Sequence, residues 1–261
     1  MTPRKTNRNQ PLLISVTSGK GGVGKTSIVV NLALLLAAGF NSRVLVVDCD
    51  LGLANVDILL GLSPEKNLYD VLKGEIDLAN VVIDTGVGFD VLPASSGVSE
   101  MADISAGDQG RLLTLLARLF RMYDVVLLDT GAGITSTVIR FNQVAHENIV
   151  LISPEPTSIT DAYALIKVLR NRIGRNRFYL LINMVKNEAE GLQVGKHLSN
   201  VVHRFLEIET SYLGHVVMDD YVQRAVLKQQ AFSQIFPNSP AAGCLREVVK
   251  KVNLWTAAGK E

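Results

Sequence analysis

The sequence predicts an α/β fold, in which helices cover both faces of a doubly wound, mainly parallel sheet within a single domain. Short apolar runs of strand length recur along the chain, and segments with helical spacing separate most of them. The runs are apolar at successive positions, which is typical of strands buried on both faces. With 261 residues, the chain can bury one large core.

The strands are expected where these apolar runs occur. They occupy residues 12–17, 43–48, 89–92, 124–129, 148–152, 178–183 and 212–217. Helices are expected where apolar residues recur three and four positions apart. Those segments occupy residues 25–38, 108–121, 134–146, 158–170 and 191–206. Ligands bind at the carboxyl ends of parallel strands, so functional residues are expected directly after them.

The composition indicates a cytoplasmic protein. Lys plus Arg number 26 and Asp plus Glu number 25, so net charge gives no argument for nucleic acid or an anionic surface. Cys49 and Cys244 lack C-x-x-C spacing and predict neither a disulfide framework nor a zinc site. The polar N-terminus does not resemble a signal peptide, and no apolar run approaches the ~20 residues that span a bilayer.

Residues 19–26, Gly-Lys-Gly-Gly-Val-Gly-Lys-Thr, match the phosphate-binding pattern G-x-x-x-x-G-K-[ST] at every fixed position. They lie between an expected strand and an expected helix, where free backbone N–H groups and the helix dipole favour phosphate. The pattern therefore predicts a nucleoside triphosphate site. The expected nucleotide-binding residues in this loop are Gly19, Lys20, Gly21, Gly22, Val23, Gly24, Lys25, Thr26 and Ser27.

Individual side chains of the loop have expected roles. Lys25 should contact the β- and γ-phosphates, and the Thr26 hydroxyl should ligate Mg²⁺. The glycines allow the backbone to approach the phosphate oxygens closely. Lys20 is a second lysine that the general pattern does not require.

Acidic residues follow two of the expected strands. Asp48 and Asp50 follow the apolar run Val44–Val47, and Asp129 follows the apolar run Val125–Leu128. Such carboxylates are suited to a Mg²⁺-bound nucleotide, so Thr26, Asp48 and Asp129 are the expected metal residues. Asp48 and Asp50 leave the same edge of the sheet, so one of them can help order the metal shell while the other reaches the attacking water. The alternative for an aspartate at a strand end is to cap a turn or a helix.

Several segments resemble one family. Residues 17–26 resemble the deviant Walker A motif of the MinD/ParA P-loop ATPases, and residues 48–57 resemble their first switch. Three further segments are similar to the FlhG/FleN flagellar-number regulators within that family. These segments are residues 92–97, 129–134 and 154–167. The resemblance runs from about residue 11 to about residue 255.

The resemblance implies ATP and Mg²⁺ as cofactors and a homodimer when ATP is bound. Lys20 would reach across the dimer to the partner's phosphates, and Asp50 would act on the attacking water. The expected catalytic residues are Lys20, Lys25 and Asp50. Asn183 resembles the family's adenine-reading asparagine. The loop around residues 217–219 lacks the family's usual proline, so its adenine contacts stay open.

The resemblance also implies partners and a domain layout. A FleQ-like transcription activator is the expected partner, with the FlhF GTPase or basal-body components as alternatives, and direct contact with nucleic acid is not expected. Residues 1–10 would form a flexible polar tail and lack the D-Q-A-x-x-L-R motif by which some members stimulate FlhF. Residues 11–242 would form the ATPase domain, and residues 243–261 an amphipathic helix and tail.

Two surface features carry open alternatives. Apolar residues recur at helical spacing near the C-terminus, at Leu245, Val248, Val249, Val252 and Trp255. This stripe predicts a helix packed on the domain, with weak contact to a membrane surface as the alternative. Five cations occur within residues 167–177, which is typical of a solvated helix end and also compatible with partner binding.

Four functions compete for this sequence. The leading hypothesis is an ATP-dependent dimerisation switch with slow hydrolysis that regulates flagellar number or placement. The alternatives are a ParA-type DNA-segregation ATPase, a MinD-type division-site ATPase and an iron–sulfur carrier. Cytoplasmic localisation is expected, with peripheral placement at the inner face of the membrane or at the cell pole as the alternative.

Overall fold

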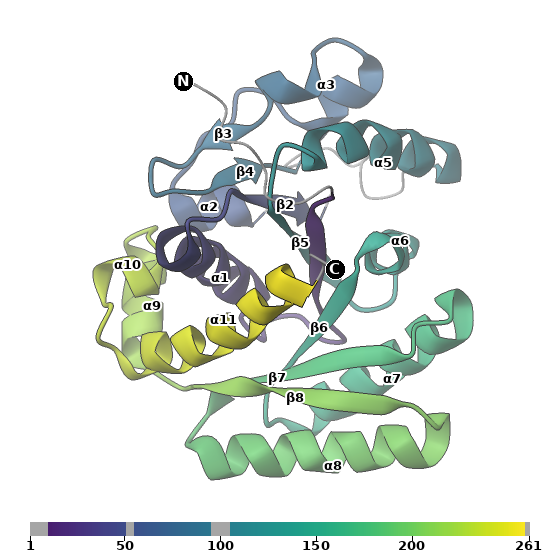
Figure 1. The fold of residues 1–261 in the computed structure, drawn as a ribbon, viewed down its shortest axis with the longest axis vertical. Coiled ribbons are helices and arrows are strands. Elements are labelled where there is room, and N and C mark those ends of the chain that lie inside the picture. Colours follow the sequence, from purple (N-terminus) through teal and green to yellow (C-terminus); the bar gives the residue numbers. More distant parts are fainter. Residues whose placement is uncertain (1–9, 51–54, 95–104, 259–261) are drawn as a thin grey trace.

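The computed structural model describes residues 10–50, 55–94 and 105–258 (Figure 1). Within this part of the chain, the centre is an eight-stranded sheet in the order β3-β4-β2-β5-β1-β6-β7-β8. The strands are β1 (Leu12–Ser18), β2 (Val44–Cys49), β3 (Ile83–Asp84), β4 (Asp90–Leu92), β5 (Val125–Ala132), β6 (Glu147–Ile152), β7 (Arg177–Val185) and β8 (Glu209–Val217). Neighbouring strands are parallel, except that β3 runs antiparallel to β4.

Helices connect the parallel strands. The helical elements are α1 (Lys25–Phe40), α2 (Val56–Leu60), α3 (Leu68–Lys73), η1 (Leu78–Asn80), α5 (Ala106–Phe120), α6 (Ser136–Val144), α7 (Pro156–Ile173), α8 (Glu188–Leu206), α9 (Asp220–Leu227), α10 (Phe232–Ile235) and α11 (Pro240–Ala258). The predicted strands and main helices are all present. The short elements α2, α3, η1, β3, α9 and α10 were not predicted.

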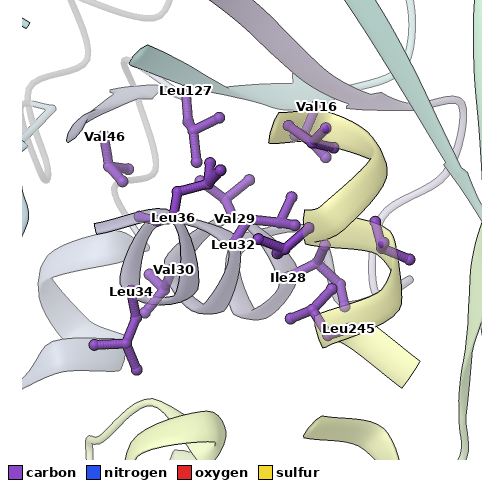
Figure 2. Packing of buried hydrophobic residues seen from close by; sticks show 14 of the residues in the cluster. Val16, Ile28, Val29, Val30, Leu32, Leu34, Leu36, Val46, Leu127 and Leu245 are labelled. Carbon is purple, nitrogen blue, oxygen red and sulfur yellow. The ribbon is translucent and has the colours of Figure 1, made fainter. Parts of the chain in front are cut away.

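Helices cover both faces of the sheet, as the side chains of β2 show. Val44 and Val46 pack in the same apolar cluster as α1, whereas Leu45 and Val47 pack in the cluster that contains α5. Figure 2 shows part of the first cluster, where side chains of α1 pack against Val46 and Leu127 of the sheet and Leu245 of α11 lies beside Ile28. Because alternate residues of a strand point to opposite faces, burial of both sets confirms the doubly wound architecture.

The helix α11 packs its apolar stripe on the domain. Leu245, Val248, Val249 and Val252 are buried in the cluster of α1, and α11 also contacts β8. The ring of Trp255 lies against Tyr179, with the ring centroids 4.2 Å apart. Packing on the domain therefore accounts for the apolar stripe of α11. Among the described helices, none is long and apolar enough to cross a membrane.

Two arginines of the cationic run within residues 167–177 contact neighbouring elements of the fold. The guanidinium of Arg175 donates to the backbone carbonyls of Asn142, Gln143 and Ala145, which lie at the C-terminal end of α6. Arg177 forms an ion pair with Glu147 on the neighbouring strand. A cation at a helix C-terminus satisfies carbonyls that the helix leaves without partners, so Arg175 has a structural role.

Candidate functional site

The phosphate loop joins the end of β1 to the start of α1. Gly22 and Gly24 have φ angles of 77° and 84°, in the left-handed region that favours glycine. A Cβ atom on Gly19 would lie 2.2 Å from the backbone of Asp161 in α7, so a side chain has no room there. The loop therefore needs these glycines for its shape and for its support by α7.

A cleft of about 630 Å³ opens over this loop. Besides the loop, residues from the end of β2, from α2 and from α9 line it. The lining residues are Ser18, Lys20, Gly21, Gly22, Val23, Gly24, Lys25, Thr26, Ser27, Asp50, Asn55, Ile58, Leu59, Ala132, Val226, Leu227 and Gln229. A Cβ atom on Gly21 or Gly22 would meet nothing within 4 Å, so their backbone borders open space. The cleft thus exposes an anion-binding backbone at a helix N-terminus.

Asp129 is buried beside Lys25, which lines the cleft. The ammonium of Lys25 lies 3.6 Å from Oδ1 of Asp129. This oxygen is buried and has no hydrogen-bond partner among the described residues. Burial raises the pKa of Asp129, whereas Lys25 and the hydrogen bond from Thr26 oppose that rise.

The orphaned oxygen of Asp129 fits a hard cation such as Mg²⁺ near the Thr26 hydroxyl. Within the described chain, no group of three or more His, Cys, Asp or Glu residues could hold a metal ion by itself. Mg²⁺ usually keeps several waters and binds through one or two carboxylates plus substrate phosphates. The site therefore fits Mg²⁺ that arrives with a triphosphate.

Asp48 accepts hydrogen bonds from the backbone of residues beyond the end of β2. Its carboxylate accepts hydrogen bonds from the backbone N–H groups of Asp50, Asn55 and Val56, at 2.8 to 3.2 Å. Burial and the neighbouring Asp129 raise the pKa of Asp48 to about 7. In this geometry Asp48 caps the start of α2, as the alternative interpretation expected, and its role as a metal residue stays a prediction.

Asp50 lies one residue beyond β2 and lines the cleft. Its carboxyl carbon lies 3.5 Å from the position of a Cβ atom on Gly131, at the end of β5. The structure thus brings Asp50 and the phosphate loop to the same cleft, as predicted, while its action on water stays a prediction. Residues 51–54 and 95–97, which belong to two of the segments that indicated the family, lie outside the described residues.

Lys20 contacts its own chain. Its ammonium forms an ion pair with Glu155 and lies 3.2 Å from the hydroxyl oxygen of Thr157, at the start of α7. About 38% of the Lys20 side chain and 61% of the Glu155 side chain are exposed. Both residues are therefore accessible, and reaching a second subunit would require Lys20 to leave Glu155.

Asn183, near the end of β7, contacts the phosphate loop. Its side-chain amide donates to the backbone carbonyl of Val23 at 2.8 Å, although 160 positions separate the two residues. The predicted contact with adenine is not tested by this geometry. Sequence reasoning also missed Ile58, Leu227 and Gln229, which line the same cleft as the loop. No local pattern marks them, because they reach the cleft only through the tertiary fold.

Comparison with known proteins agrees with this site. Residues 14–232 match the family model described as the CobQ/CobB/MinD/ParA nucleotide binding domain, which covers most of the chain. The chain belongs to this family of P-loop nucleotide-binding proteins. Its membership and the residues of the cleft define an ATPase that uses ATP and Mg²⁺.

Two curated relatives indicate which group within the family this chain resembles. The chain is 42% identical to the antiactivator FleN of Pseudomonas aeruginosa, across 93% of this chain and 86% of the relative. It is 33% identical to the flagellum site-determining protein YlxH of Helicobacter pylori, across 89% of this chain and 78% of the relative. The predicted similarity to the FlhG/FleN group is confirmed.

Solved structures show the same fold. The cell division ATPase MinD of Pyrococcus furiosus superposes with a TM-score of 0.78 at 23% identity, covering 94% of this chain and 99% of the other. MinD of Pyrococcus horikoshii, complexed with Mg-ADP, gives 0.77 at 22% identity, covering 96% and 99% of the two chains. The predicted MinD/ParA-like fold is confirmed.

Proposed function

We propose that this chain is an ATP-dependent dimerisation switch with slow hydrolysis, which regulates the number or placement of flagella. The observation that carries the proposal is the presence of a second loop lysine, Lys20, in a chain similar to FleN and YlxH. A lysine on an exposed rim of the phosphate loop is suited to act on a triphosphate held by another subunit.

The first step is capture of the triphosphate. The backbone N–H groups of residues 21–25 bind the phosphate oxygens, and Lys25 neutralises part of the β- and γ-phosphate charge. Thr26 and Asp129 would hold Mg²⁺, which would offset negative charge on the phosphates. Lys25 then shifts its electrostatic partner from Asp129 to the nucleotide.

The second step couples dimerisation to hydrolysis. Lys20 leaves Glu155 and contacts the phosphates of the partner subunit, where its charge stabilises the transition state as an arginine finger does. Asp50, at the mouth of the same cleft, orients the attacking water. Loss of the γ-phosphate removes the contact that holds the two subunits together, so hydrolysis resets the switch.

The ATP-bound dimer acts on a protein partner. The name of the relative FleN, an antiactivator, supports a transcription activator of the FleQ type as that partner. FlhF or basal-body components are the alternative partners, and the membrane or cell pole is the alternative to a purely cytoplasmic location. The boundaries proposed for the tail, the ATPase domain and the C-terminal helix are residues 1–10, 11–242 and 243–261.

Counting flagella per cell tests this function. Cells that lack the gene should gain flagella, and the wild-type gene should restore the original number. Genes encoding Lys20→Ala or Asp50→Ala should fail to restore it, whereas Lys196→Ala, an exposed lysine on α8, should restore it. Unchanged counts together with lost plasmid or chromosome inheritance would contradict the proposal and favour the DNA-segregation function.

A further inference from the structure

The strand β7 contains an extra residue next to the phosphate loop. Asn183 pairs with Val216 of β8, and Val185 pairs with the next residue, Val217, so Met184 has no counterpart. Met184 has a φ angle of 60°, which is uncommon for a residue other than glycine. This is a β-bulge, a feature that often redirects a side chain beside an active site.

The bulge changes which side chains face the loop. Ile182 and Val185 lie in one apolar cluster, although regular alternation would place them on opposite faces of the sheet. Asn183 and Met184 are both directed toward Gly24. A Cβ atom on Gly24 would lie 2.6 Å from the Asn183 amide nitrogen and 3.5 Å from the terminal methyl of Met184.

The contact between Asn183 and the loop is specific. The Asn183 amide donates to the Val23 carbonyl at 2.8 Å, in a site where only 7% of Asn183 is exposed. A carbonyl acceptor requires the nitrogen of the amide to face it, which fixes the orientation of the side chain. The bond fixes the peptide that joins Val23 to Gly24, directly before the helix N-terminus.

We propose that Asn183 is a positioning residue for the phosphate loop. By bonding Val23 and filling the space beside Gly24, it holds the loop backbone in the shape that binds phosphate before the nucleotide arrives. This support acts on the polyphosphate whatever base is attached. The bulge also brings the terminal methyl of Met184 beside Gly24, so two neighbouring residues of β7 support the same part of the loop.

The proposal and the adenine-reading role predict different binding profiles. The test uses the full-length protein with saturating Mg²⁺ and measures the affinities of ATP, GTP and inorganic tripolyphosphate by calorimetry. The variants are Asn183→Leu, which is close in size and uncharged, and Asn183→Ala. Asn200→Leu, at an exposed asparagine of α8, is the matched control, and circular dichroism checks that each variant is folded.

If Asn183 positions the loop, Asn183→Leu should weaken all three ligands by a similar factor, about tenfold to a hundredfold for a buried carbonyl left without its donor. Asn183→Ala should weaken them less, because water can reach the Val23 carbonyl. A loss confined to ATP would overturn the proposal in favour of base reading. Unchanged affinities in a folded variant would overturn it as well, and Asn183→Ala carries the test if the leucine variant does not fold.

Discussion

Lys20 of the phosphate loop is ion-paired with Glu155, the residue immediately before α7 in the same chain. The loop lysine that we propose to act across a dimer is therefore held in its own subunit. Because both side chains are substantially exposed, the pair is worth at most about 1 kcal/mol. Lys20 can therefore leave Glu155 and contact a phosphate of the partner subunit at a small cost in free energy.

Removing the carboxylate should favour the dimer. Glu155→Gln frees Lys20 from its ion pair in both subunits, so the ATP-bound dimer should form at up to about thirtyfold lower protein concentration. Analytical ultracentrifugation in ATP measures this change, with Glu209→Gln, an exposed glutamate of β8, as the control. A weaker dimer in the Glu155 variant would show that Glu155 supports the dimer instead of competing with it.

Loss of Lys25 should abolish most nucleotide affinity. Lys25→Ala removes the cation that faces Asp129 and the phosphates, and a charge-assisted hydrogen bond contributes about 1.5–3 kcal/mol. The affinity for ATP should therefore fall at least about tenfold, as measured by calorimetry. Lys196→Ala provides the charge-matched control. Binding within twofold of wild type would contradict the assignment of the loop.

The pKa of Asp48 predicts a pH dependence of stability. Burial and Asp129 raise this pKa from 3.8 to about 7, so the folded protein holds the proton more tightly than the unfolded chain. The resulting stabilisation is complete below pH about 4 and is lost as the pH rises through about 7. Asp48→Asn does not titrate and should lack this component.

Urea unfolding between pH 4 and pH 8 in the presence of EDTA tests this prediction on the metal-free protein. The free energy of unfolding of the wild type should fall relative to that of Asp48→Asn as the pH rises. The variant also loses acceptor capacity toward the backbone of Asp50 and Asn55, so the comparison concerns the slope with pH and not the absolute stability. Parallel slopes for the two proteins would contradict the raised pKa.

The apolar stripe of α11 should stabilise the domain. Leu245 is fully buried, and its truncation in Leu245→Ala should lower the free energy of unfolding by about 2–5 kcal/mol. Leu254→Ala, at a position that is 66% exposed on the same helix, should change it by at most about 0.5 kcal/mol. Similar small effects at both positions in chemical denaturation would show that the stripe does not pack as described.

Strand and helix periodicity predicted most of the fold because it is a local property of the sequence. Both faces of β2 are buried, so its run of apolar residues could be recognised without knowledge of its neighbours. The short helix α3 was missed although it carries a capping box, with Asn67 at its start and Asp70 three residues later. That signal was present in the sequence and would have identified the helix.

The site was predictable where a motif fixes the chemistry, and unpredictable where distant segments meet. The phosphate loop and the strand-end aspartates were identified from spacing alone. The bond from Asn183 to Val23 joins β7 to the phosphate loop, and the hydrogen bond from Gln229 to Ile58 joins the loop after α9 to α2. Such contacts depend on tertiary packing and leave no periodic signal in the chain.

The mass of the protein in solution tests the central claim most directly. Asp50→Ala, which should bind ATP and hydrolyse it poorly, is measured by light scattering at saturating Mg-ATP and again at saturating Mg-ADP. We expect twice the monomer mass with ATP and the monomer mass, 28.3 kDa, with ADP. The same mass with both nucleotides, when calorimetry shows that both are bound, would contradict the switch.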